Sequence, residues 1–335
     1  MTAPRVAFVT DAGGEAGLGH FKRCAALAQA LGARGAAADV LVSGPRDEAG
    51  LAAVAPQLAP TPLDWWGAPR RVLEAVAGRG VEAFVVDSYH ADERLFAALR
   101  GAALVVAIDD LADRPLPVDA VVNGAWHAER LDYRVPREAL RLLGPRYTLL
   151  DRAFAEAPVR TTAERVERVL VTLGGSTPAS ETAAAVTAVR TALPQARLDV
   201  LGGLVAASAA PAPGVTRHGA VPGLRPLLVA ADLAVTGGGM TLYECLATGT
   251  PAVAVCLADN QRPNLEHLGA AGLVVVSDLA TLAPAVARTT GDRALRERVS
   301  AAGRRAIDGG GAARVAGELV GLIAARRARP VGAAR

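Results

Sequence analysis

The sequence predicts an α/β protein made of two halves, each with a parallel sheet covered by helices on both faces. The chain has 335 residues, whereas single hydrophobic cores stop growing at roughly 250–300 residues. Short apolar runs alternate with Ala-, Leu- and Arg-rich helical stretches along the chain, a pattern typical of parallel sheets. Residues 154–167, rich in Ala, Pro, Thr and charge, interrupt it. We therefore expect two Rossmann-like domains, 1–155 and 165–325, facing each other across a cleft.

The individual elements follow from the apolar runs and the helical periodicity. In the first half we expect strands at 5–10, 39–43, 83–87, 103–109 and 120–123, and helices near 20–33, 69–78 and 92–100. In the second half we expect strands at 169–173, 198–201, 215–218, 233–236, 253–257 and 274–276, and helices near 179–193, 241–247, 262–271 and 292–307. Ligands of such sheets bind at the carboxyl ends of the strands, so the residues that follow each strand are the candidates for function.

Composition excludes several function classes. No apolar stretch approaches the ~20 residues that a spanning helix needs, so we expect no integral membrane association. The net charge is only +3 and the Arg residues are scattered, which argues against nucleic-acid binding. Neither the three cysteines nor the five histidines have the spacing of a metal site, so we expect no metal and no cofactor. With no apolar signal region in the sequence, we expect a cytoplasmic protein, either monomeric or weakly oligomeric.

The first candidate motif is the glycine-rich loop and helix start at residues 11–23. Gly17 and Gly19 would let the backbone approach a ligand closely, and the helix N-terminus offers free N–H groups. The loop lacks the Gly-Lys-Ser/Thr of a P-loop, and an ordinary strand-to-helix turn remains the alternative. His20 favours function, because the positive end of a helix disfavours an imidazolium and suits a neutral base.

Polar residues also end two neighbouring apolar strands. Asp87 and Tyr89 follow one strand, and Asp109 and Asp110 follow the next. Tyr89 is the more notable because the chain has few aromatic residues. Helix capping or a loop hydrogen bond explains Asp87 or Asp110 about equally well.

Three turns of the second half are candidates for holding a diphosphate and a sugar. One follows the strand at 169–173 with Gly174, Gly175 and Ser176; one carries Gly238, Gly239, Met240, Thr241 and Glu244; the third is Asp259, Asn260 and Gln261. Bare backbone at a helix N-terminus leaves room for phosphate oxygens. Thr241 and Glu244 also fit a capping box, and the first turn also fits a hydroxyl N-cap. Both structural alternatives stay open at this point.

The order of these motifs resembles one family. The motifs are Gly17-Leu-Gly-His-Phe-Lys-Arg23, Val86-Asp-Ser-Tyr89, Asp109-Asp-Leu111, Leu143-Gly-Pro-Arg-Tyr147, Leu170-Val-Thr-Leu-Gly-Gly-Ser176, Gly238-Gly-Met-Thr-Leu-Tyr-Glu244 and Asp259-Asn-Gln261. Over residues 5–320 they are similar to the nucleotide-sugar hydrolases of pseudaminic acid biosynthesis, which act on UDP-2,4-diacetamido-2,4,6-trideoxy-β-L-altropyranose, and to the related spore coat polysaccharide proteins. That superfamily has the GT-B fold and includes the MurG glycosyltransferase.

The resemblance implies release of UDP from an unusual amino sugar by water that His20 activates, without a metal. It assigns catalysis to His20, Tyr89 and Asn260, the diphosphate to Gly238, Gly239 and Thr241, the ribose to Glu244, and the uracil to backbone at 220–224. The remaining candidates for contact with the nucleotide or sugar are Gly17, Gly19, Arg23, Asp109, Gly174, Gly175, Ser176, Val221, Met240, Asp259 and Gln261. The partner is a small-molecule nucleotide-sugar, with UDP as the expected nucleotide.

Two other functions compete with this one. In the first, an inverting GT-B glycosyltransferase uses His20 to activate the hydroxyl group of an acceptor instead of water. In the second, the protein binds a nucleotide-sugar without turnover, and the presence of His20 argues against it. The resemblance itself has one departure: the hydrolases usually carry a Gly-Ser-Thr-x-Trp-Glu type turn where this chain has Gly-Gly-Met-Thr-Leu-Tyr-Glu, which is closer to the spore coat branch.

Overall fold

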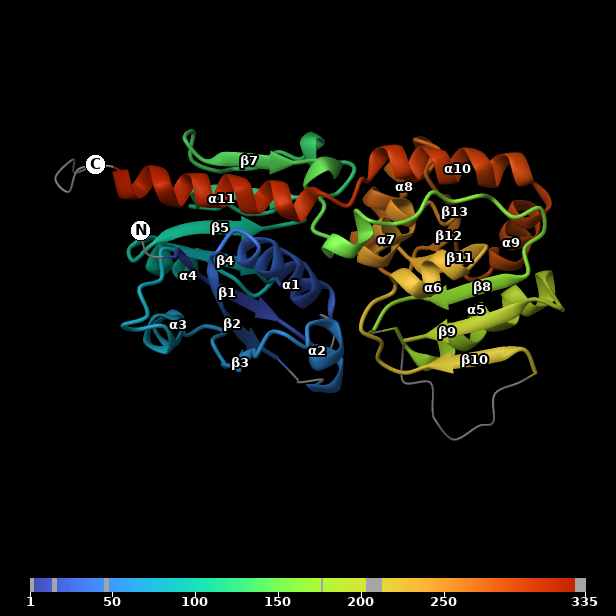
Figure 1. The fold of residues 1–335 in the computed structure, drawn as a ribbon, viewed down its shortest axis with the longest axis horizontal. Helices are drawn as coiled ribbons and strands as arrows, with labels where there is room; N and C mark the ends of the chain where they lie inside the picture. The colour runs from blue at the N-terminus through green and yellow to red at the C-terminus, as the bar shows by residue number, and fades with distance from the viewer. Residues whose placement is uncertain (1–2, 14–16, 45–47, 176, 203–212, 329–335) are drawn as a thin grey trace.

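A computed structural model describes residues 3–13, 17–44, 48–175, 177–202 and 213–328, which form two α/β domains (Figure 1). The first domain has a seven-stranded sheet in the order β3-β2-β1-β4-β5-β6-β7, and the strands pair in parallel throughout. Its elements are β1 (Arg5–Asp11), α1 (Gly19–Gly32), β2 (Ala37–Ser43), α2 (Glu48–Val54), β3 (Thr61–Pro62), α3 (Pro69–Ala75), β4 (Ala83–Asp87), α4 (Glu93–Arg100), β5 (Leu104–Ile108), β6 (Ala120–Asn123) and β7 (Leu140–Leu143).

The second domain has a six-stranded parallel sheet in the order β10-β9-β8-β11-β12-β13. Its elements are β8 (Arg168–Thr172), α5 (Ala179–Ala192), β9 (Arg197–Leu201), β10 (Val215–His218), α6 (Arg225–Ala230), β11 (Leu233–Gly237), α7 (Met240–Thr248), β12 (Ala252–Val255), α8 (Arg262–Ala270), β13 (Val275–Ser277), α9 (Leu282–Gly291) and α10 (Arg293–Ala306). A last helix, α11 (Gly311–Ala328), ends the described chain.

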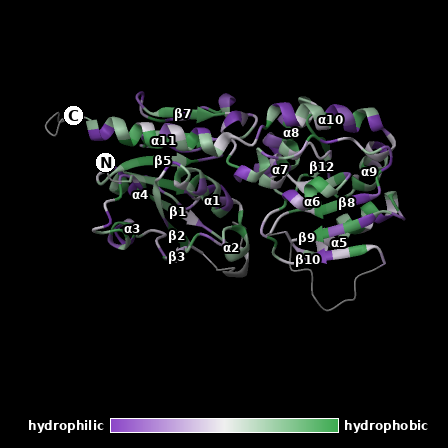
Figure 2. Cartoon of the chain, in the orientation of Figure 1, coloured by the Kyte–Doolittle hydropathy of each residue, from purple (hydrophilic) through white to green (hydrophobic). Residues whose placement is uncertain are grey.

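The central strands explain why both sheets are parallel and covered on two faces. Every residue of β4, β5 and β12 is buried, and these strands are near-continuously apolar, as parallel strands between two helical layers must be. Figure 2 shows the strands of the first sheet mostly in the hydrophobic colour. Helix α4 instead has a narrow apolar stripe, and the Asp92 side chain caps it by accepting a hydrogen bond from the Leu95 N–H.

The expected strands and helices are present, with ends that differ by at most three residues, but the sequence analysis missed several elements. These are α2, β3, β7, α6, α9 and α11. Strand β3 is two exposed residues long, and β7 is a half-buried edge strand, so neither carries a strong apolar run. Helix α11 is rich in Ala and Gly and has almost no apolar asymmetry around its axis, which hides it from any search for periodicity.

Helix α11 belongs structurally with the first domain, although residues 165–325 had been expected to form the second. It crosses back and lies beside α1 (Figure 1). Its buried face, Ala312, Val315, Ala316, Leu319 and Ile323, is part of the hydrophobic cluster that also contains residues of α1 and β1. The chain therefore passes between the domains twice, once near residue 155 and once near residue 310.

The start of α11 fits the first domain so closely that it requires glycine. A Cβ atom on Gly311 would lie 2.7 Å from the backbone nitrogen of Thr148, whereas one on Gly321, in the same helix, would meet nothing within 4 Å. We expect Gly311→Ala to lower the free energy of unfolding by about 1–3 kcal/mol through overpacking. The matched control Gly321→Ala should raise it by about 0.5–1 kcal/mol. Urea titration of both variants tests this, and equal effects would contradict the packing argument.

Arginine side chains hold residues 154–167, which interrupt the alternating pattern, against the second domain. Arg160 donates to the carbonyl oxygens of Leu228 (3.3 Å) and Ala231 and to Thr250 Oγ1 (3.2 Å). Arg296, 1% exposed, donates to two carbonyl groups of residues 163–164, each at 3.0 Å.

In the chain as described, no helix is both long and apolar enough to cross a membrane.

Candidate active site

The site begins at the carboxyl ends of β1 and β4, which are neighbours in the first sheet. Their parallel register pairs Thr10 with Asp87, so the loop after β1 and the end of β4 lie at the same edge. In that loop Gly17 has φ +58°, a left-handed conformation that favours glycine. Gly19 begins α1, and a Cβ atom there would meet nothing within 4 Å. His20 follows in the first helical turn and is buried.

His20 and Asp87 form a buried pair. His20 Nδ1 lies 2.5 Å from Asp87 Oδ1, and Asp87 is fully buried. Because a carboxylate only accepts, a hydrogen on Nδ1 donates to Asp87, and in the tautomer that this contact selects Nε2 is the nitrogen that can accept a proton. The pair therefore has the arrangement of a general base and the carboxylate that orients it. Asp87 was the member of this pair for which sequence reasoning found capping equally plausible.

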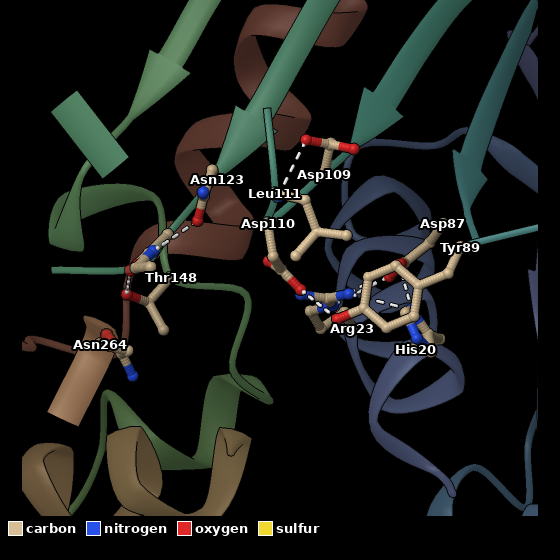
Figure 3. Close-up of polar contacts among 12 residues, drawn as sticks. His20, Arg23, Asp87, Tyr89, Asp109, Asp110, Leu111, Asn123, Thr148 and Asn264 are labelled. Carbon is tan, nitrogen blue, oxygen red and sulfur yellow. Dashed lines mark hydrogen bonds and ion pairs between the residues drawn. The ribbon is translucent and has the colours of Figure 1, made fainter. Parts of the chain in front are cut away.

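Arg23 binds the carboxylates around His20 (Figure 3). Its guanidinium donates to both oxygens of Asp87, at 2.7 and 2.9 Å, and Nη1 lies 2.7 Å from both oxygens of Asp110. Burial alone would lower the pKa of Arg23, but Asp110 and Asp87 outweigh it and raise that pKa. Burial would likewise raise the pKa of Asp110, but the charge of Arg23 outweighs it and lowers that pKa. Arg23 and Asp110 are thus both charged at neutral pH.

The Tyr89 ring lies against the His20 ring. The two rings meet edge to face with centroids 4.6 Å apart, and the phenol donates to Asp110 Oδ2 at 3.2 Å. Burial, followed by the charge of Asp110, raises the pKa of Tyr89, so the phenol stays protonated. The side chain is still 42% exposed, which leaves it able to contact a ligand.

Asp109 does not pair with His20, Arg23 or Tyr89 in the described structure. Its neighbour Asp110 binds both Arg23 and Tyr89. The Asp109 carboxylate is buried and accepts hydrogen bonds from the backbone N–H groups of Leu111 (3.1 Å) and Ala112 (2.8 Å). Burial raises the pKa of Asp109. In the structure the Asp109 carboxylate closes a loop, and Asp110 is the one that pairs with Arg23.

A buried carboxylate at the end of β1 holds an exposed aromatic surface next to this pair. We call Trp66, Tyr89 and His90 the aromatic surface. Asp11, 1% exposed, accepts from Trp66 Nε1 at 2.8 Å and from the Ser88 hydroxyl, which itself accepts from the His90 N–H at 2.9 Å. The Trp66 and His90 rings lie 4.0 Å apart, and Trp66 is 38% exposed.

In the second domain the glycine turn after β11 serves packing and leaves a free helix end. Cβ atoms on Gly237 and Gly238 would lie 2.5 Å from the Leu173 carbonyl oxygen and 2.9 Å from Gln261 Cβ, so both positions require glycine. A Cβ on Gly239, the residue before α7, would meet nothing. The first N–H groups of α7, from Met240 onward, lack partners within the helix. This is the end of the turn where a phosphate fits.

Glu244 lies one turn into α7 and does not form the capping box that its spacing allows. No side chain caps α7, whose N-cap is Gly239, and Thr241 is already helical. Glu244 is 7% exposed, and its Oε2 is buried without a hydrogen-bond partner among the described residues. Its Oε1 lies 3.6 Å from the Nζ of Lys22 in the first domain. A buried carboxylate with a free oxygen suits a ligand hydroxyl.

The remaining predicted residues of the second domain are spread around this turn. Gly174 and Gly175 follow β8, and Ser176 lies outside the described residues. Val221, in the loop before α6, packs against the core of the second domain. Asp259 and Asn260 are exposed on a 3₁₀ turn, residues 259–261, while Gln261 turns inward and accepts from the Gly238 N–H at 3.1 Å.

Two residues that sequence reasoning missed connect this turn with the first domain. The buried Asn264 on α8 donates to the Gly238 carbonyl at 3.4 Å and accepts from the Tyr243 hydroxyl at 2.6 Å. That hydroxyl accepts from the Trp126 N–H of the first domain at 2.9 Å. Nothing in the sequence signals this contact, which depends on how the domains meet.

Within the described residues, no group of three or more His, Cys, Asp or Glu side chains is placed to hold a metal ion.

Comparison with known proteins identifies the fold. No family model matches the sequence, and no curated protein matches it significantly. Among solved structures, the glycosyltransferase of kitacinnamycin superposes with a TM-score of 0.66 at 21% identity, covering 96% of this chain and 99% of that one. MurG of Acinetobacter baumannii gives 0.61 at 16% identity, with 95% and 100% coverage. A putative UDP-N-acetylglucosamine 2-epimerase of Listeria monocytogenes gives 0.64 at 12% identity, covering 98% of each. The chain therefore has the GT-B fold.

Proposed function

We propose that this protein transfers a glycosyl group from a nucleotide-activated sugar to the hydroxyl group of an acceptor, with His20 as the general base. The observation that carries the proposal is the His20–Asp87 pair: Nδ1 is bound to a fully buried carboxylate, and Nε2 is left to accept a proton. Further support comes from similar structures, several of which are glycosyltransferases by name, including CalG4 and the forosaminyltransferase SpnP.

In the proposed reaction the acceptor oxygen attacks the anomeric carbon while its proton passes to His20 Nε2. The new carbon–oxygen bond forms as the bond to the diphosphate oxygen breaks, and the electron pair of that bond leaves with the nucleoside diphosphate. Asp87 stabilises the imidazolium that forms. The free N–H groups at the start of α7 offset the charge that develops on the diphosphate. Attack opposite to the leaving group inverts the configuration of the anomeric carbon.

The second domain would hold the nucleotide. Bare backbone at Gly239 and the start of α7 suits the diphosphate, and the unpartnered Oε2 of Glu244 suits a ribose hydroxyl. The backbone at 220–224 would then contact the nucleobase of the nucleotide. We propose UDP as the nucleotide; the similar glycosyltransferase SsfS6 was solved with thymidine diphosphate, so dTDP-sugars belong in the same test.

The aromatic surface favours an acceptor molecule over water. Trp66 and Tyr89 are 38% and 42% exposed, and Trp66 is fixed by its hydrogen bond to Asp11. Exposed aromatic side chains beside the general base His20 offer a stacking surface for a ring of the acceptor, whereas a water molecule needs no such surface.

The second candidate is the hydrolase that the motif order implies. In it, water takes the place of the acceptor hydroxyl, His20 removes its proton, and Tyr89 and Asn260 orient the water and the sugar. The seven ordered motifs of the sequence favour this candidate, and the chemistry of the base is the same. The two candidates differ only in the nucleophile.

One experiment separates them. The protein is incubated with UDP- and dTDP-sugars, with and without a mixture of glycoside and cyclic alcohol acceptors, and nucleotide release is followed by chromatography. We expect release to depend on an acceptor and a glycosylated product to appear. Release at the same rate from donor alone would establish the hydrolase instead. No release from any donor, with or without acceptor, would contradict both.

A further inference from the structure

Lys22 is the only lysine of the chain, and it makes an ion pair between the two domains. It lies in α1 two residues after His20, and its Nζ is 3.6 Å from Oε1 of Glu244 in α7. The Lys22 side chain is 27% exposed, and that of Glu244 is 9% exposed. Lys22, which lies on the same helix as His20, is thus in contact with Glu244, the residue proposed to bind the ribose.

This ion pair is incomplete on both sides. Charge-assisted N–H···O bonds are about 2.7–2.9 Å long, so a separation of 3.6 Å is a charge contact without a good hydrogen bond. Glu244 Oε2 is buried and has no partner among the described residues. Both groups therefore have hydrogen-bonding capacity that a ligand at this interface could use.

The position of the ammonium group points to the diphosphate. Glu244 is four residues after Met240, which in an α-helix is about 6 Å along the axis. A diphosphate at the free N–H groups of Met240 and its neighbours would thus lie within reach of a side chain already in contact with Glu244. Arg23, the next basic residue of α1, is already bound to Asp87 and Asp110.

We propose that Lys22 is a nucleotide-binding residue that exchanges partners: ribose hydroxyls replace it on Glu244, and its ammonium group moves to the diphosphate. The proposal rests on the proposed function and adds to it a cation from the opposite domain. Lys22 would offset the charge of the departing diphosphate and draw the two domains together around the ligand, because it comes from one domain and the helix N-terminus from the other.

The first test compares the affinities of Lys22→Met, Lys22→Arg and the wild type for UDP, dTDP and uridine by calorimetry. We expect Lys22→Met to weaken UDP and dTDP binding by about tenfold or more. Uridine lacks the diphosphate and does not have to displace a cation from Glu244 in Lys22→Met, so it should bind this variant at least as tightly as the wild type. Lys22→Arg should restore most of the diphosphate affinity. Arg34→Met, which removes an equal charge from an exposed position beyond the end of α1, should bind UDP as the wild type does.

The second test uses the single lysine directly. Reductive methylation with formaldehyde and cyanoborohydride modifies only Lys22 and the α-amino group, which serves as the internal reference in mass spectrometry. We expect UDP to slow methylation of Lys22 relative to the reference, and Glu244→Gln to speed it in the absence of UDP. This readout does not require turnover.

The outcomes distinguish this proposal from the proposed function. If the wild type binds UDP but neither Lys22 methylation nor the UDP affinity of Lys22→Met changes, the partner exchange is wrong and the nucleotide site stands. If Lys22→Met weakens uridine as much as UDP, Lys22 acts only through Glu244 and the diphosphate contact is wrong. If the wild type binds neither UDP nor dTDP, the nucleotide site itself is wrong and this proposal is overturned with it.

Discussion

His20→Asn should reduce kcat for nucleotide release by about 10²–10⁴-fold, the contribution typical of a positioned general base. Asparagine can still donate a hydrogen bond to Asp87 through its amide N–H, but it cannot take the proton of the attacking hydroxyl. UDP affinity should remain close to that of the wild type, because the groups proposed to bind the nucleotide lie on the second domain. Single-turnover nucleotide release measures the first quantity, and calorimetry with UDP measures the second.

A second histidine provides the contrast. His90 lies at the same sheet edge, but its ring packs at a tilt against Trp66, and among the described residues no hydrogen bond or ion pair joins it to Asp87. We expect His90→Asn to raise KM for the acceptor and to leave kcat largely unchanged, because it alters the aromatic surface and not the base. Loss of UDP binding together with activity in His20→Asn would make His20 a structural residue and contradict the assignment.

The fold was largely predictable because its strands are buried on both faces. Strands such as β5 show this as unbroken apolar runs, and α7 begins shortly after β11 ends. Helix α11 was missed for a physical reason: it packs through Ala and Gly, whose small side chains give almost no apolar stripe. Its return to the first domain is set by tertiary contacts, such as that of Gly311 with Thr148, that local sequence does not carry.

The active site was predictable as a set of strand ends but not as a set of contacts. The sequence indicates that His20, Asp87 and Asp109 all follow strands, yet which carboxylate meets the imidazole depends on the order of strands in the sheet. Because β4 is the neighbour of β1, Asp87 reaches His20, whereas Asp109, one strand further, closes its own loop. The Lys22–Glu244 contact is less predictable still, because it requires two separately folded domains to meet.

Asp87→Asn tests whether the carboxylate, and not the histidine alone, makes the base. The amide can occupy the same space and accept from Nδ1–H, but it lacks the charge that stabilises the imidazolium in the transition state. We expect kcat to fall by about 10²–10⁴-fold. Asp87 is fully buried and receives three hydrogen bonds from His20 and Arg23, so its removal should also lower the free energy of unfolding by about 3–5 kcal/mol.

Asp110→Asn separates these two effects, because it disturbs Arg23 while leaving the Asp87–His20 pair in place. Losing the 2.7 Å contacts of Arg23 should cost about 1.5–3 kcal/mol of stability at neutral pH, with kcat far less affected than in Asp87→Asn. The fold lowers the pKa of Asp110, so its stabilisation is complete above the ordinary carboxyl pKa of about 4 and is lost as the pH falls through the lowered value. The stability difference between wild type and Asp110→Asn should therefore shrink below about pH 4. If both variants lost activity in proportion to their stability, Asp87 would be a structural anchor for Arg23, and the role of His20 as a base would have to rest on the imidazole alone.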